Sequence, residues 1–189
     1  MGRHKSGKLH TRESKSQQAR LARAGLIEVW CDGSFIHDKG LKGAAAVYTN
    51  SEGKNPRVSC WTLNDAFFVV SESGAAELWA ATLALENAPA CKVGILNSDC
   101  PTVGSVIEKI RGGRLNPIRH SGPLFDRLAD ALKIQPQMAF RHVTRNVGKI
   151  PVANAFAQGA AYEDEKALDA ASRRFREMPY SYSAADITR

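Results

Sequence analysis

Three apolar, β-prone segments follow one another closely near the start of the chain, and predicted helices and strands alternate after them. The first three segments are residues 27–31, 43–49 and 57–63, which are close enough in sequence to pair as an antiparallel meander. The later segments are helices over 75–87, 102–110, 123–133 and 152–175, the last one long and rich in alanine, with strands over 92–97 and 137–143. This order predicts an α/β fold, in which a five-stranded mixed sheet of order 3-2-1-4-5 carries helices on both faces.

The positive charge of the chain is concentrated at its start. The formal net charge of the 189 residues is +7, and residues 1–26 contain seven Lys or Arg residues against Glu13 alone. A basic arm gains affinity for polyphosphates by releasing counterions, so nucleic acid is the first partner to consider. The alternative is a solvated terminus without a partner. We therefore divide the chain into a basic arm (1–26), one globular domain (27–176) and a C-terminal tail (177–189).

Composition excludes several other classes of protein. With 43% hydrophobic and 24% charged residues, the chain is neither collagen-like nor wholly disordered. Its four cysteines form no C-x-x-C pair, which argues against a zinc site. We find neither the run of roughly 20 apolar residues that a membrane span needs nor the apolar segment of an export signal. We expect a cytoplasmic protein, and a monomer.

Acidic residues stand where the first and fourth strands are expected to end. Asp32 opens the turn signal Asp32-Gly33-Ser34 after the first strand, and Asp99 follows the fourth. These strands are predicted neighbours, about 4.8 Å apart, and open α/β sheets bind ligands at the carboxyl ends of such strands. Glu77, in the first turn of the helix after the meander, is placed to reach the same crevice. The sequence therefore predicts three converging carboxylates.

Carboxylates that converge must either raise their pKa values or bind a cation. Oxygen ligands select hard ions, and Mg²⁺ held by a few carboxylates is the expected occupant, with Mn²⁺ as a substitute. Two such ions, about 3.5 to 4 Å apart, can activate a water molecule and stabilise the leaving oxygen of a phosphodiester. The predicted cluster thus points to phosphodiester hydrolysis.

Four short motifs, in this order along the chain, together resemble ribonuclease H of type 1. The resemblance spans about residues 27–161 and is carried by residues 29–34 (VWCDGS), 77–81 (ELWAA), 97–99 (NSD) and 152–157 (VANAFA). It implies a ribonuclease H-like fold and a magnesium-dependent endonuclease, a hydrolase that cuts the RNA strand of an RNA/DNA hybrid with two metal ions. It further implies that Asp32 bridges the two ions and that Glu77 and Asp99 hold the leaving-group side.

The fourth carboxylate of this family belongs on the last helix, where this chain has Asn154. The resemblance therefore implies a catalytic and metal-binding set of Asp32, Glu77, Asp99 and Asn154, with a weakly held ion on the side of the attacking water. Three explanations of Asn154 remain open. The first is a deliberate change made to trap a complex, and the isosteric replacement of Asp by Asn favours this explanation slightly. The second is a natural slow variant, and the third is a natural nuclease with a rearranged fourth ligand.

Two segments that bind substrate in the family are also altered. The loop over residues 144–149 lacks the histidine that assists turnover in many members, and its Arg145 is either a phosphate ligand or an ordinary surface charge. Residues 71–74 (SESG) replace an Asn-rich turn, and serine hydroxyls there can still bond to a ribose 2′-OH. The predicted substrate-binding set is Gly33, Ser34, Ser71, Ser73 and Arg145.

Two other functions remain as alternatives to this nuclease. One is a nucleic-acid-binding module of the same fold with little or no cleavage. The other is a related nuclease that acts on another nucleic-acid structure, as resolvases, integrases and exonucleases do. The three acids Asp32, Glu77 and Asp99 favour an enzyme, because a protein that only binds has no physical need to bring them together.

Overall fold

The sheet has the predicted strand order. The computed structural model describes residues 26–50, 57–63, 73–89, 93–115 and 122–177. The strands are β1 (Leu26–Ile36), β2 (Leu41–Asn50), β3 (Arg57–Leu63), β4 (Val93–Ser98) and β5 (Met138–His142). They form one mixed sheet in the order β3-β2-β1-β4-β5. The β1–β2 and β2–β3 pairs are antiparallel, whereas β4 is parallel to both β1 and β5.

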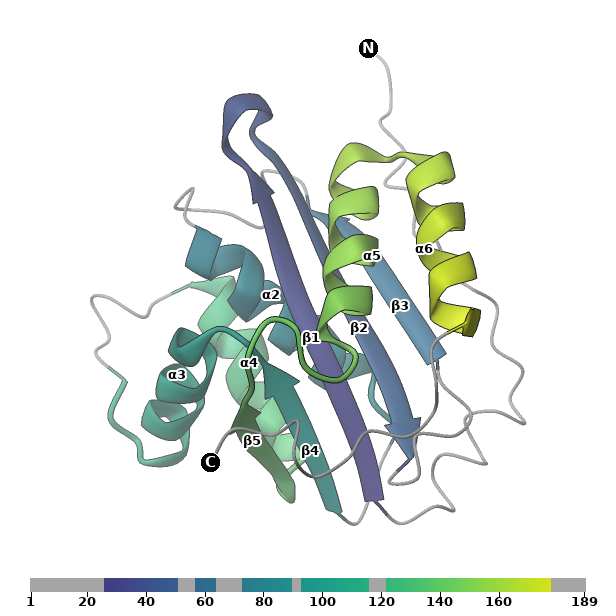
Figure 1. The fold of residues 1–189 in the computed structure, drawn as a ribbon. Helices are drawn as coiled ribbons and strands as arrows, with labels where there is room; N and C mark the ends of the chain where they lie inside the picture. The colour runs from purple at the N-terminus through teal and green to yellow at the C-terminus, as the bar shows by residue number, and fades with distance from the viewer. Residues whose placement is uncertain (1–25, 51–56, 64–72, 90–92, 116–121, 178–189) are drawn as a thin grey trace.

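Helices cover both faces of this sheet, as predicted (Figure 1). The helices are α2 (Ser73–Asn87), α3 (Pro101–Arg111), α4 (Pro123–Ile134), α5 (Ile150–Tyr162) and α6 (Glu165–Glu177). Along β1, Val29 and Cys31 belong to the core beneath α2, α3 and α4, while Trp30 belongs to the core beneath α5 and α6. This alternation follows from the two-residue period of a strand and produces two separate hydrophobic layers.

The first strand continues beyond the predicted turn at Asp32-Gly33-Ser34, so that prediction of its end is wrong. These three residues pair with residues 43–45 of β2, and β1 runs on to Ile36. The chain reverses in the 3-10 helix η1 (His37–Lys39), followed by Gly40 at a φ of 64°. Pairing with β2 outweighs the local turn preference of an Asp-Gly-Ser sequence. Asp32 therefore lies within a strand.

The predicted final helix over residues 152–175 is also wrong, because the structure has two helices there. Glu163, at a φ of 52°, ends α5, and its N–H lies 3.2 Å from the carbonyl oxygen of Ala160. The Asp164 Oδ1 atom then accepts hydrogen bonds from the N–H groups of Lys166 and Ala167, at 2.9 and 3.2 Å. Asp164 thereby caps the start of α6, a role for which aspartate is favoured.

Parts of the predicted organisation lie outside the described residues. These parts are residues 1–25 of the basic arm, Ser71, and residues 178–189 of the tail, so the division of the chain into three regions stays a prediction. Within the described ranges, every helix is too short or too polar to cross a bilayer.

Candidate metal centre

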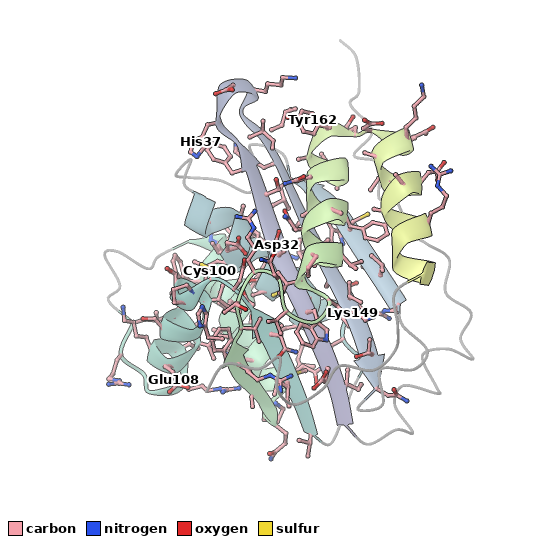
Figure 2. All side chains as sticks on the ribbon, viewed as in Figure 1. Asp32, His37, Cys100, Glu108, Lys149 and Tyr162 are labelled. Carbon is pink, nitrogen blue, oxygen red and sulfur yellow. The ribbon has the colours of Figure 1, made fainter. Side chains whose placement is uncertain are left out.

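Three carboxylates come together where the parallel pairing of β1 with β4 ends. Asp32 lies in β1, Glu77 in α2 and Asp99 directly after β4, and one oxygen of each lies within 4.8 Å of the others. The parallel pairing of β1 with β4 ends at Trp30 and Asn97, so Asp32 and Asp99 each stand two residues past the last pair. Figure 2 labels Asp32 on β1, on which α5 packs. The predicted convergence of these three acids is confirmed.

Glycine at position 33 allows α2 to approach β1 closely enough to deliver Glu77. A Cβ atom on Gly33 would lie 2.3 Å from the carbonyl carbon of Ala76 and 2.4 Å from the backbone nitrogen of Glu77. The Gly33 N–H also donates a hydrogen bond to Glu77 Oε2 at 3.0 Å. A side chain at this position would collide with the backbone of α2. The glycine therefore sets how closely α2 approaches β1 and, through its N–H, the direction of the Glu77 carboxylate.

Burial and mutual repulsion raise the pKa values of two carboxylates of the cluster, Asp32 and Glu77. Asp32 is 3% exposed, and burial together with the charge of Asp99 raises its pKa from 3.8 to about 7. Burial, followed by the charge of Asp32, raises the pKa of Glu77 from 4.5 to about 9. The nearby Arg145 charge lowers both pKa values, but by less than burial raises them. At neutral pH the cluster is therefore partly protonated in the absence of a cation.

The donor set fits a hard divalent cation. All three donors are carboxylate oxygens, which Mg²⁺ and Mn²⁺ prefer. The Asp32 Oδ2 atom is buried and has no hydrogen-bond partner among the described residues. A buried oxygen without a partner costs free energy, which a bound cation would recover. Asp32, Glu77 and Asp99 are therefore the residues that could hold a metal ion.

Asn154 lies near the start of α5, on the helix that crosses the strand carrying Asp32. Before it, Gly148 lies against the ring of Trp30, and after it, the carbonyl of Ala157 lies against Gly43. These two contacts place α5 along β1 and β2 at the level of the carboxylate cluster. The Asn154 side chain is partly buried. Its ligation of a metal ion stays a prediction.

The predicted substrate residues have different environments. The N–H of Gly33 donates a hydrogen bond to Glu77 within the cluster, and Ser34 is buried, with 7% exposure. Ser73 begins α2, and Ser71 lies outside the described residues. Arg145 is exposed in the loop between β5 and α5, close enough to the cluster for its charge to act there. Among the members of this set whose exposure the structure describes, Arg145 is the exposed side chain.

Two neighbours of the cluster were not assigned to the site from the sequence. His142, at the end of β5, has its Nε2 atom 3.2 Å from the carbonyl oxygen of Asp99. Cys100 is half-buried, and burial and the charge of Glu77 raise its pKa. The position of Cys100 directly after Asp99 was a usable signal, whereas that of His142 depends on the pairing of β5 with β4.

Comparison with solved structures identifies the fold. Ribonuclease H1 from the halophilic archaeon Halobacterium salinarum superposes with a TM-score of 0.57 and 19% identity, covering 74% of this chain and 99% of that one. The N-terminal RNase H domain of Rv2228c from Mycobacterium tuberculosis gives a TM-score of 0.54 and 16% identity, covering 79% and 98%. No protein-family model and no curated protein sequence matches this chain. The chain therefore has a ribonuclease H-like fold.

Proposed function

We propose that this protein is a metal-dependent endonuclease that hydrolyses the RNA strand of RNA/DNA hybrids. The observation that carries the proposal is the convergence of three acids from remote parts of the chain, with oxygens within 4.8 Å, in a ribonuclease H-like fold. Two Mg²⁺ ions, or Mn²⁺ in their place, would supply a Lewis acid and lower the pKa of the attacking water.

The residues of the cluster would have different roles in holding the metal ions. Asp32, the most buried, would bridge the two ions, and its unpartnered Oδ2 atom supports this role. Glu77, oriented by the N–H of Gly33, and Asp99 would hold the leaving-group side. Asn154 would offer an amide oxygen without a charge, so the ion on the side of the attacking water would be weakly held.

Substrate recognition would use contacts around this centre. The exposed Arg145 is suited to a phosphate near the cluster, because a guanidinium forms charge-assisted hydrogen bonds with phosphate oxygens. Ser71 and Ser73 would contact the 2′-OH that distinguishes RNA from DNA. The basic residues of the arm would bind backbone phosphates without sequence preference. Recognition of a hybrid then combines one ribose contact with several phosphate contacts.

Cleavage of labelled substrates by the full chain tests this proposal. RNA/DNA hybrid, RNA duplex and DNA duplex are incubated with Mg²⁺ or Mn²⁺, and the chain is compared with Asn154→Asp. We expect selective cutting of the hybrid, which rises on the order of tenfold or more with the added charged ligand. Gln158→Glu is the matched control, because it adds the same charge at an exposed position of α5 and should leave the rate unchanged.

Asn154 also supports a second candidate, a binding module with little or no cleavage. An amide at the fourth ligand position removes one charge from the site while leaving the surface around it in place. This candidate predicts that the hybrid still binds and that neither the chain nor Asn154→Asp cuts it. That result would reject the nuclease.

A further inference from the structure

The loop between β5 and α5 is anchored at its first end beside the carboxylate cluster. The N–H of Val143 donates a hydrogen bond to the carbonyl oxygen of Ser98 at 3.1 Å, directly before Asp99. The ring of His142 contacts the carbonyl of Asp99 at 3.2 Å. From there the loop leaves the end of β4 and crosses β1 toward α5 (Figure 1).

The second end of the loop is anchored on Trp30. Gly148 has a φ of +61°, and a Cβ atom there would lie 2.2 Å from the six-membered ring of this tryptophan. Trp30 is 5% exposed, and the guanidinium of Arg141 lies 5.7 Å from its ring centroid. Arg141 is itself bound to Asn97 Oδ1 at 2.6 Å. The indole is therefore a fixed surface on which the glycine rests.

Arg145 lies between these two anchors. Its side chain is exposed, and the loop that carries it is held at one end by the carbonyls of Ser98 and Asp99 and at the other end by Trp30. A long, exposed side chain holds a defined position only if its backbone is held. Trp30 provides such a support, and it lies two residues before Asp32 on the same strand.

We propose that Trp30 is a positioning residue, whose ring packs against Gly148 and fixes the 144–149 loop so that Arg145 stands beside the carboxylate cluster. Trp30 acts through Arg145 and touches no reacting atom. This inference rests on the proposed function in one respect, which is that Arg145 contacts the substrate. The effect of Arg145 on a cation in the cluster is independent of cleavage.

The affinity of the full chain for Mn²⁺, measured at low salt by electron paramagnetic resonance, tests the coupling without any substrate. Four chains are compared: the unchanged protein, Arg145→Gln, Gly148→Ala and the double variant. Removing a positive charge beside the site should lower the Mn²⁺ dissociation constant by about two- to fivefold. Gly148→Ala should lower it similarly, because it displaces the loop, and the double variant should match Arg145→Gln alone.

Gly113→Ala separates backbone strain from the contact with Trp30. Gly113 has nearly the same φ, +62°, but a Cβ atom there meets nothing within 4 Å. Both alanine variants should lower the melting temperature, whereas Gly113→Ala should leave Mn²⁺ affinity unchanged. Trp30→Phe removes the ring that touches Gly148 and repeats the test from the other side of the contact, whether or not Gly148→Ala folds.

Two results would overturn the positioning role. One is a change in Mn²⁺ affinity from Gly148→Ala or Trp30→Phe that persists with Arg145→Gln present. The other is unchanged Mn²⁺ affinity in a folded Trp30→Phe protein. Hybrid cleavage then separates this inference from the proposed function. If the chain cuts hybrid, Trp30→Phe should raise KM severalfold and do so only when Arg145 is present. If it cuts nothing, the Mn²⁺ measurements still decide the positioning role.

Discussion

Replacing Asp32 with asparagine should stabilise the metal-free protein, although it removes the central ligand. In the folded chain the pKa of Asp32 is raised from 3.8 to about 7 by burial and by Asp99. Between these two pH values the folded state keeps a proton that the unfolded state has released. Stability therefore falls as pH rises through this window, and the loss is complete above the folded pKa. Asparagine carries no charge, so the Asp32→Asn protein does not lose stability in this way as pH rises.

The size of the effect follows from the two pKa values. A difference of about three pH units, at about 1.4 kcal/mol each, corresponds to about 4 kcal/mol in the fully ionised limit. Between pH 4.5 and 7.5, the advantage of Asp32→Asn over the unchanged chain should grow by about 3 kcal/mol. Neutralising Asp32 also relieves Glu77, because Asp32 is the main charge that raises the pKa of Glu77. This second gain has the same sign.

Urea unfolding in EDTA at several pH values measures this advantage. Asp169→Asn, at an exposed position of α6, is the matched control and should show no such growth. Added Mg²⁺ should stabilise the unchanged chain more than Asp32→Asn, by about 2.7 kcal/mol at a concentration of 100 Kd if the variant does not bind. A pH-independent difference, or an Asp32→Asn chain that is less stable than the unchanged one at pH 7.5 in EDTA, would refute the reasoning.

Two further changes test the close approach of α2 and the role of the arm. Gly33→Ala should cost about 3 kcal/mol or more and abolish Mn²⁺ binding, because its Cβ atom would lie 2.3 Å from the backbone of Ala76. Gly74→Ala, with nothing within 4 Å, should be neutral or stabilising in the same melting experiment. Removing residues 1–25 takes away seven basic residues, so the slope of hybrid affinity against salt should flatten by up to about 6. An unchanged slope would exclude the arm from binding.

Much of the site could be predicted because it depends on the order of the strands. Local apolar periodicity placed β1 and β4, and right-handed crossovers made them neighbours. Asp32 and Asp99 then had to lie past the same end of the parallel β1–β4 pair. Glu77 followed from its place in the first turns of the next helix. These conclusions need only the spacing of residues along single elements.

Other features depend on contacts between segments that are distant in sequence. The turn preference at residues 32–34 was overruled by pairing with β2, and the depth of α2 was set by Gly33 against Ala76. The elevated pKa of Asp32 likewise comes from burial and from Asp99. The amino-acid order by itself determined how the strands are arranged, because this follows from local pattern and chain connectivity, but it did not show that the last predicted helix divides into α5 and α6. Tertiary structure alone decided how closely the elements approach and how strongly the acids hold protons, because both depend on atoms that only folding brings together.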